Sequence, residues 1–322
     1  MHSLTRRSLI LALAAASSFA QAQGGYPSRT IEWVVPYPAG GGTDVVARTL
    51  GQAVSEILGQ PVIINNKPGA ATNIGADYTA RAKPDGYTVM SADTATLAAN
   101  PALYSHLPYN AEKDFAPVGL TVRFPMILVV NNSVPAKNLP EFLAWARKTG
   151  NTTYATPGAG SPHHLATELF KDQAKLSLTH VPYRGAAPAV QDVVAGQVPF
   201  MFVDTASGKE FIASGKLRPI GVASPRRVVN FENIPTLSEQ GMKGFEAYAW
   251  QGVVMPAATP PEVVKKFSEA LQKAMASTQV RARLQVLGLE PIPGSPAEMA
   301  KYAAAERTKW GQVIRANNIR VD

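Results

Sequence analysis

The chain of 322 residues carries 31 Lys and Arg against 23 Asp and Glu, a formal net charge of +8, and it has no cysteine. The lack of cysteine excludes a disulfide framework, a thiolate metal site and a cysteine nucleophile. The basic residues are scattered, which indicates mild attraction for small anions and argues against a nucleic-acid surface. A solvated surface without any partner is the simplest interpretation of the charge alone.

The first 22 residues have the features of a cleaved export signal. Arg6 and Arg7 precede an apolar run over residues 9–16, and Ala20-Gln21-Ala22 offers a small-x-small cleavage site. The pattern predicts a signal peptide over 1–22 and a mature periplasmic chain that begins near Gln23, and it leaves the Sec or twin-arginine route open. No later segment approaches the roughly 20 apolar residues of a membrane span.

The mature chain opens with a strand, a glycine turn and a helix. Residues 31–35 form a β-branched run, Gly40-Gly41-Gly42 makes the turn, and Thr43 or Asp44 is the expected N-cap of the helix. A helix N-terminus behind such a turn leaves backbone N–H groups unpaired at the positive end of the helix dipole. The unit therefore predicts an anion-binding site.

Strands and helices then alternate, which predicts a parallel sheet in a doubly wound α/β domain. Further strands are expected over 61–64 and 87–90. Ligands of such sheets bind at the carboxyl ends of the strands. The loops expected to converge at that edge are 38–43, 70–73 and 91–96.

A second α/β series follows in the middle of the chain. Ser161 is the expected N-cap of a helix that begins with Pro162, and Asp204 ends a strand over 199–203. This series repeats the strand, glycine loop and helix N-terminus of the opening unit. The other strands expected here cover 126–130, 152–156, 178–181 and 218–223.

The last third reads as one strand over 250–255, followed by helices without further strands between them. Ser295 and Glu298 form a capping box before a helix that extends to about Ala316. These helices are expected to cover the first domain. The predicted fold is therefore two doubly wound α/β domains, 23–124 plus 236–322 and 125–235, with a hinge and an interdomain cleft as in a periplasmic binding protein of the Venus-flytrap type.

A nucleotide site is disfavoured by the residues around the glycine turn. Thr43-Asp44 stands where a Walker motif requires Lys-Ser/Thr, and Val45 stands where the dinucleotide motif requires its last glycine. The strand over 61–64 ends in Asn65-Asn66 and not in an acidic residue that would hold a ribose. No cofactor is expected.

Catalysis is also disfavoured. His163 and His164 beside Ser161 are the best candidates, but adjacent helix residues point about 100° apart, and neither a G-x-S-x-G elbow nor an H-E-x-x-H motif is present. Asp204 could act as a base, cap a helix or contact a ligand amine or hydroxyl. We expect no catalytic residue, no metal ligand and no enzyme activity, and we keep a periplasmic hydrolase that uses Ser161 or Asp204 as a remote alternative.

Nine short motifs occur along the mature chain in a specific order. The chain resembles the Bug, or TctC-type, periplasmic solute receptors of tripartite tricarboxylate transporters over essentially its whole mature length. The residues that carry the resemblance are 36–41, 84–88, 100–104, 107–110, 113–115, 155–158, 181–185, 235–241 and 256–260.

The resemblance implies a flytrap that captures a small organic acid for a membrane permease. In the family, the two loops that hold the carboxylates match Tyr37–Thr43 and Ala155–Ser161, and positions that match Asn73, Thr94, His164 and Asp204 line the cleft and vary with the ligand. The ligand could be a di- or tricarboxylate, an aromatic acid or an amino acid. The expected ligand-binding residues are Tyr37, Ala39, Gly40, Gly41, Thr43, Asn73, Thr94, Thr156, Gly158, Ser161, His164 and Asp204.

The expected partners are the carboxylate and the permease subunits, with no nucleic acid and with the receptor as a monomer. A sensor that passes the ligand signal to a two-component kinase would use the same fold. The sequence does not separate transport from signalling, and it does not identify the acid.

Overall fold

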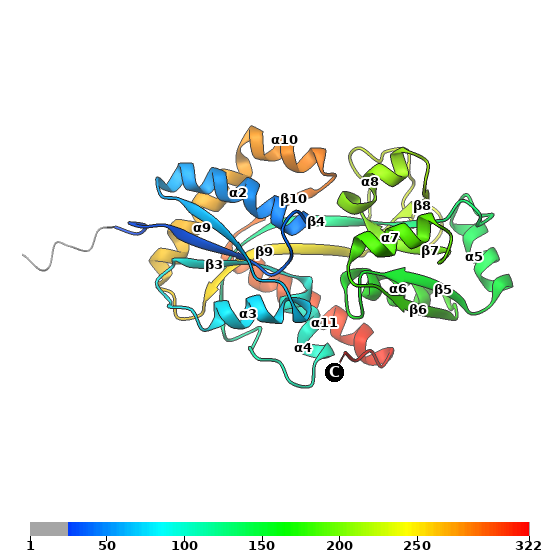
Figure 1. Cartoon of the computed structure of the whole chain (residues 1–322), viewed down its shortest axis with the longest axis horizontal. Coiled ribbons are helices and arrows are strands. Elements are labelled where there is room, and N and C mark those ends of the chain that lie inside the picture. The colour runs from blue at the N-terminus through cyan, green and yellow to red at the C-terminus, as the bar shows by residue number, and fades with distance from the viewer. Residues whose placement is uncertain (1–24, 322) are drawn as a thin grey trace, which may run out of the picture.

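The computed structural model describes residues 25–321 and shows two lobes that lie side by side (Figure 1). The predicted signal peptide lies outside the described residues. The strands form one continuous set in the order β2-β1-β3-β9-β4-β7-β5-β6, and β8 and β10 also pair with β4. The α/β fold class expected from the sequence is confirmed.

Strand β4 joins the lobes because it is long enough to enter both. It spans Phe115–Val130; residues 115–125 pair with β9, and residues 126–130 pair with β7 and β8. We call lobe 1 the part built on the first half of β4 and its neighbours, and lobe 2 the part built on the second half. The domain limits expected from the sequence remain a prediction.

Lobe 1 is a mixed sheet with helices on both faces. Its helices α2, α9 and α10 share one buried apolar cluster, while α4 and α11 belong to a second cluster on the opposite face. Its other strands are β1 (Ile31–Val35), β2 (Val62–Asn66), β3 (Thr88–Asp93), β9 (Tyr248–Pro256) and β10 (Glu290–Gly294). Its helices are α2 (Gly42–Leu58), α3 (Asn73–Ala80), α4 (Asn100–Leu103), α9 (Pro261–Ala276), α10 (Thr278–Val286) and α11 (Pro296–Ala316), with short turns η1 (Ala70–Thr72) and η2 (Ala95–Ala99).

Lobe 2 repeats this arrangement on a smaller scale. Strands β5 and β6 are parallel, and β7 lies between β5 and β4. Its other strands are β5 (Thr152–Thr156), β6 (Leu178–Pro182), β7 (Phe200–Asp204) and β8 (Arg218–Val222). Its helices are α5 (Leu139–Thr149), α6 (Pro162–Ala174), α7 (Ala186–Val194) and α8 (Thr205–Ala213).

Two local expectations were wrong. A strand, β10, separates α10 from α11, where the sequence predicted helices without a strand between them. Pro291 and Pro293 have no backbone N–H to donate, so the segment does not have the sequence of a regular strand. It pairs with β4 alone among the described strands. The N-cap of α2 is Gly41 and not Thr43 or Asp44. The capping box of Ser295 and Glu298 at the start of α11 is confirmed.

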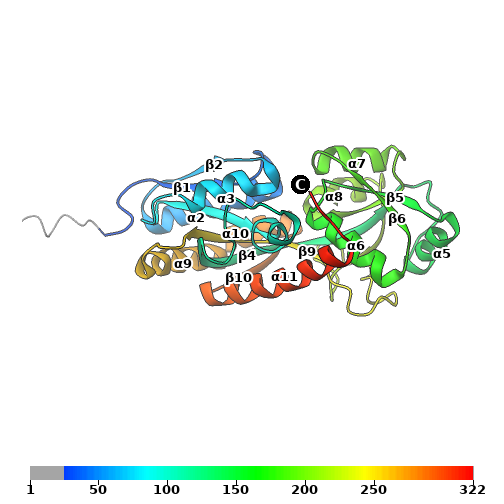
Figure 2. The ribbon, with the colours of Figure 1, turned by 90° about the horizontal axis from the view of Figure 1, so that it is seen from below.

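Helix α11 connects the two lobes along one side (Figure 2). Trp310 and Ile314 on this helix are fully buried in the same apolar cluster as Phe170 and Phe245 of lobe 2. After the helix ends, Asn317 Nδ2 donates to Asp172 Oδ2 on α6 at 2.8 Å. Among the described residues, no helix is long and apolar enough to cross a membrane.

The strand directions bring the carboxyl ends of both sheets to the junction between the lobes. Strands β1 and β3 are parallel to each other, and β4 leaves lobe 1 at the end where they finish. On entering lobe 2, Met126 of β4 pairs with Asp204, the last residue of the antiparallel strand β7. The loops after β1 and β3 therefore face the loops after β5, β6 and β7.

Candidate functional site

The loop after β1 is held by the buried carboxylate of Asp44. Its Oδ2 accepts the backbone N–H of Gly40 at 2.8 Å, and its two oxygens also accept from Arg48 and from Asn66 Nδ2. Burial opposes ionisation of Asp44, but the hydrogen bonds from Arg48, Gly40 and Asn66 outweigh it and lower the pKa of the carboxyl. Gly40 adopts a left-handed conformation, with φ of 85°, that suits glycine.

This arrangement leaves the first turn of α2 without a side-chain cap. The N-cap residue is Gly41, which has no side chain, and Asp44 in the first turn bonds back to Gly40. The first amide groups of α2 thus stay available at the positive end of a 17-residue helix. Ala39, Gly40 and Gly41 are exposed, and Thr43 is half-buried.

Three other residues expected to bind the ligand also support this wall with their side chains. The Tyr37 hydroxyl donates to Asp93 Oδ2 at 2.5 Å, and the Thr94 hydroxyl bonds the backbone of Trp250. Asn73 is buried, and its Oδ1 accepts from Asn100 at 2.7 Å. Burial raises the pKa of the Asp93 carboxyl despite the donors around it.

The loop after β5 is held in the same manner by a neutral histidine. The Ser161 hydroxyl caps α6 by accepting from His164 N at 3.2 Å, and His164 Nδ1 accepts the N–H of Gly160 at 3.0 Å. Burial, together with the neighbouring His180, lowers the pKa of His164 to about 3. His164 is therefore neutral at pH 7, and its proton is on Nε2.

A second histidine supports the end of β5. The rings of His164 and His180 stack with centroids 3.8 Å apart, and His180 Nε2 lies 2.6 Å from Thr156 Oγ1. The Thr156 hydroxyl also bonds the backbone of Gly158. Burial lowers the pKa of His180 to about 4. Thr156 and His164 thus fix the shape of the loop, and Gly158 and Ser161 are half-buried.

Asp204 pairs with His163, the neighbour of the histidine that the sequence favoured. Asp204 Oδ1 caps α8 by accepting from Ser207 N at 2.9 Å, and Oδ2 lies 3.2 Å from His163 Nε2. Burial alone would raise the pKa of Asp204, but the hydrogen bonds from His163 and Ser207 outweigh it and lower that pKa. Asp204 is therefore an ionised acceptor near the N-termini of both α6 and α8.

Helix α7 provides another uncapped N-terminus in lobe 2. Its N-cap is Gly185, which has no side-chain cap, and Gly185 N donates to Pro157 O of the neighbouring loop at 2.9 Å. From the sequence, residues 181–185 were used only as one of the motifs that carry the family resemblance. Glycine is a common N-cap residue that has no side chain to accept from the first amides, so the residue type itself was the signal for an N-terminus without a side-chain cap.

The two lobes touch on both sides of these loops. A Cβ atom added to Gly160 would lie 2.5 Å from Leu103 Cδ1 of lobe 1, so glycine permits this approach. On the other side, Thr205 Oγ1 donates to Gly288 O at 2.8 Å and Lys209 Nζ donates to Val286 O at 2.7 Å. The facing loops thus lie between two lobe-to-lobe contacts.

The geometry offers little for catalysis. Within residues 25–321, no hydrogen bond joins the Ser161 hydroxyl to an imidazole ring, and no group of three potential metal ligands is assembled. His163 and Asp204 form a dyad without a nucleophile in hydrogen-bond contact. The arrangement is suited to binding an anion through backbone amides.

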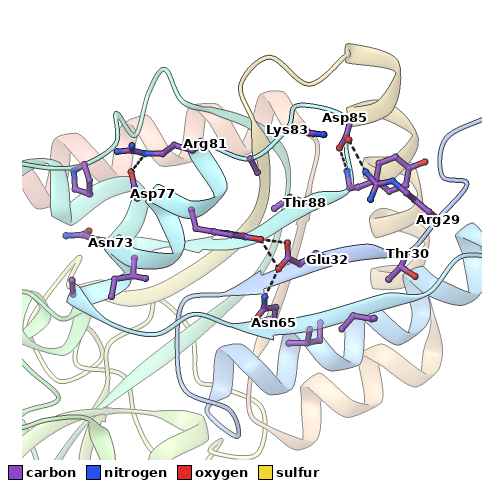
Figure 3. Close-up of a pocket in the computed structure, with 18 of the residues that line it drawn as sticks. Arg29, Thr30, Glu32, Asn65, Asn73, Asp77, Arg81, Lys83, Asp85 and Thr88 are labelled. Carbon is purple, nitrogen blue, oxygen red and sulfur yellow. Dashed lines mark hydrogen bonds and ion pairs between the residues drawn. The ribbon is translucent and has the colours of Figure 1, made fainter.

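A separate hollow lies over β1, β2 and α3 of lobe 1, with a volume of ≈ 1170 Å³ (Figure 3). Four of its charged side chains form two ion pairs, Arg29 with Asp85 and Arg81 with Asp77, and Glu32 accepts from Asn65 and Tyr78. It is lined by residues of β1, β2, α3 and the turn before β3, and of the predicted ligand-binding residues only Asn73 belongs to it. We therefore place the candidate site at the junction and not in this hollow.

Comparison with known proteins gives a consistent result. Residues 46–319 match the family described as the tripartite tricarboxylate transporter family receptor, TctC. A protein from the tcbD-tcbE intergenic region of Pseudomonas sp. is 36% identical over 95% of this chain and 91% of its own length. BugT of Bordetella pertussis is 34% identical over 90% of both chains.

Two solved structures share the fold and carry ligands. R. palustris Rpa4515 with adipate has a TM-score of 0.85 and 32% identity, covering 92% of this chain and 100% of its own. MatC from Rhodopseudomonas palustris with bound malate has a TM-score of 0.80 and 34% identity, covering 90% of this chain and 100% of its own.

Proposed function

Because the chain belongs to the TctC family of tripartite tricarboxylate transporter receptors, we propose that it binds a small carboxylate between its lobes. The observation that carries this proposal is the pair of uncapped helix N-termini, α2 in lobe 1 and α7 in lobe 2, that follow glycine loops on facing strand ends. Each supplies backbone amides and a dipole contribution of about 0.3–1 kcal/mol per charge. Solved relatives hold adipate and malate, both of which have two carboxylates.

In this proposal, the side chains of the site mostly hold the backbone, and the backbone holds the acid. Asp44 and His164 each bind the amide of a loop glycine, Gly40 and Gly160. Preorganised amides avoid the cost of ordering the loops when the ligand arrives. The proposed direct contacts are the loop amides that do not already donate within the protein, those of Ala39, Gly41 and Thr43 in lobe 1 and those of Ala159 and the first turn of α7 in lobe 2, together with the polar groups around Asp204.

The proposed output is delivery of the acid to the permease subunits of a transporter. The two lobes would close by bending where β4 crosses near Phe124 and where the chain returns between Ala223 and Tyr248. Export by the 1–22 signal, a monomeric receptor and the absence of turnover belong to the same proposal. Transport assays with the neighbouring permease genes would separate this function from signalling to a kinase.

The first test is a thermal-shift and calorimetry panel of di- and tricarboxylates, aromatic acids and acidic amino acids. An acid that binds the folded state raises the melting temperature as its concentration increases. No response to any carboxylate would contradict the proposal.

The second test substitutes leucine at Gly40, with Gly59 as the matched control. Both glycines have positive φ, 85° and 67°, and a Cβ at either position meets no atom within 4 Å. Both variants carry similar backbone strain, about 1–2 kcal/mol, but only Gly40 lies in the proposed site. Gly40→Leu should lose binding, while Gly59→Leu should be destabilised and still bind. Equal affinity in the two variants would remove the loop from the site.

A further inference from the structure

Two buried hydrogen-bonding atoms at the junction lack partners. Among the described residues, His163 Nδ1 and Gln251 Oε1 are buried without a hydrogen bond, and the third such atom is Arg123 Nε. His163 is in the first turn of α6 in lobe 2, and it is 8% exposed. Gln251 of β9 is 2% exposed and lies opposite Asp93, at the end of β3 in lobe 1.

A buried polar atom without a hydrogen bond destabilises the folded state, and native proteins usually keep one only where water or a ligand supplies the missing hydrogen bond. Gln251 pairs with the last residue of β3, and His163 contacts Asp204, the last residue of β7, so both residues lie at the edge where the strands of their lobe end. They therefore mark the same region as the two uncapped helix N-termini. This observation is independent of the helix ends, because it concerns side-chain atoms and not backbone amides.

The pairing with Asp204 decides what His163 can offer. Asp204 is ionised and can only accept, so His163 Nε2, 3.2 Å from Oδ2, carries the hydrogen. In a neutral imidazole with its hydrogen on Nε2, Nδ1 has a lone pair and accepts. Gln251 Oε1 is also an acceptor. A carboxylate, which has only acceptor atoms, cannot satisfy either.

We infer that the ligand is a carboxylate that also carries a hydrogen-bond donor, a hydroxyl or ammonium group, and that His163 is the residue that selects for it. This inference rests on the proposed carboxylate-binding function and narrows its ligand class. The backbone amides hold the carboxylates, and His163 Nδ1 accepts from the donor between them. Asp204 is a positioning residue because it sets which ring nitrogen bears the hydrogen.

Matched acids measure the preference directly. Calorimetry at pH 8 compares succinate with malate, glutarate with 2-hydroxyglutarate, adipate with 2-hydroxyadipate, and succinate with aspartate. The member with the donor should bind about tenfold to a hundredfold more tightly in at least one pair. The substitution His163→Phe should reduce that ratio to about one.

The variant Asp204→Asn gives a sharper readout. Asparagine is also a good N-cap, so Oδ1 continues to accept from Ser207 and the amide nitrogen faces His163 Nε2. The amide donates, the hydrogen of the imidazole moves to Nδ1, and the ring now donates to the ligand. Wild type should prefer 2-hydroxyglutarate to 2-oxoglutarate, and Asp204→Asn should reverse the order. Asp85→Asn, a carboxylate paired with Arg29 in the hollow of lobe 1, is the matched control and should keep the wild-type order.

The outcomes separate this inference from the proposed function. If acids with and without the donor bind equally, or if Asp204→Asn keeps the wild-type order, the role of His163 is overturned while carboxylate binding stands. If no acid of either kind binds the wild-type protein, the proposed function itself fails. Melting curves of the ligand-free variants verify that each is folded.

Discussion

Replacing Asp44 by alanine tests whether one buried carboxylate shapes the loop after β1. The side chain is 2% exposed and accepts from Gly40 N, from two nitrogens of Arg48 and from Asn66, at distances of 2.8 to 3.0 Å. Alanine would leave these donors without their acceptor. Gly40 and Asn66 would lose hydrogen bonds to a charged group, each worth about 1.5–3 kcal/mol.

The net effect is smaller than the sum of these bonds. The Arg48 side chain is 51% exposed, so water replaces much of its contact with Asp44, as it does for a surface ion pair. Gly40 is exposed and also regains water. We therefore expect Asp44→Ala to lower the free energy of unfolding by about 2–4 kcal/mol and to weaken carboxylate binding, because the Gly40 amide is no longer fixed.

Urea denaturation and calorimetry measure the two effects on one protein sample. The matched control is Asp77→Ala, which removes an Asp–Arg pair of the same i,i+4 spacing, 2.7 Å long, whose side chains are 32% and 73% exposed. That variant should change the free energy of unfolding by less than about 1 kcal/mol. If Asp44→Ala behaves like Asp77→Ala and binds carboxylates as the wild type does, Asp44 does not organise the loop.

Three further predictions concern the packing around the site. Folding lowers the pKa of His164 to about 3 and that of His180 to about 4, so below about pH 6.5 the unfolded chain binds more protons than the folded protein. The free energy of unfolding should therefore decrease as the pH is lowered from 7 to 5. Urea titrations at several pH values measure this decrease, and a flat profile would contradict the prediction. Gly160→Ala should weaken the contact between the lobes, because the new Cβ would lie 2.5 Å from Leu103 Cδ1 and because the φ of residue 160 is 71°. Small-angle scattering should report a more open molecule, and an unchanged scattering profile would argue against that contact. Trp310→Ala removes a fully buried indole from the cluster shared by both lobes and should lower the free energy of unfolding by about 3–5 kcal/mol, measured by urea denaturation. A decrease below about 1 kcal/mol would mean that α11 is not part of a shared core.

Regular periodicity made the α/β architecture predictable. Strands such as β1 and β7 are short apolar runs, and helices such as α2 and α9 show an apolar stripe that faces the sheet. Strand β10 was missed because its two prolines mask the alternation and because its pairing with β4 is a tertiary contact.

The loops of the candidate site could be located in the sequence, but the orientation of their side chains could not. Glycine turns and a capping serine mark chain reversals and helix starts in the sequence itself. Whether His163 or His164 meets Asp204 depends on a rotation of about 100° between neighbouring helix positions, which only the packing of α6 on β7 fixes. Likewise, the sequence around Thr94 does not show that the Thr94 hydroxyl accepts from the backbone N–H of Trp250, a residue distant in the chain.

These particulars explain how one scaffold can keep a carboxylate-binding backbone and still select among acids. Asp44, Tyr37, Thr156 and His164 bind loop or framework atoms, so changing any of them alters the shape of the backbone that receives the carboxylate. His163 has one ring nitrogen on Asp204 and the other without a partner, so we expect its substitution to alter which acid is preferred without removing a loop contact. In this arrangement, selectivity depends on the few buried polar atoms that have no hydrogen-bond partner within the protein. An acid that cannot bond to them leaves those atoms buried and unsatisfied, which weakens its binding.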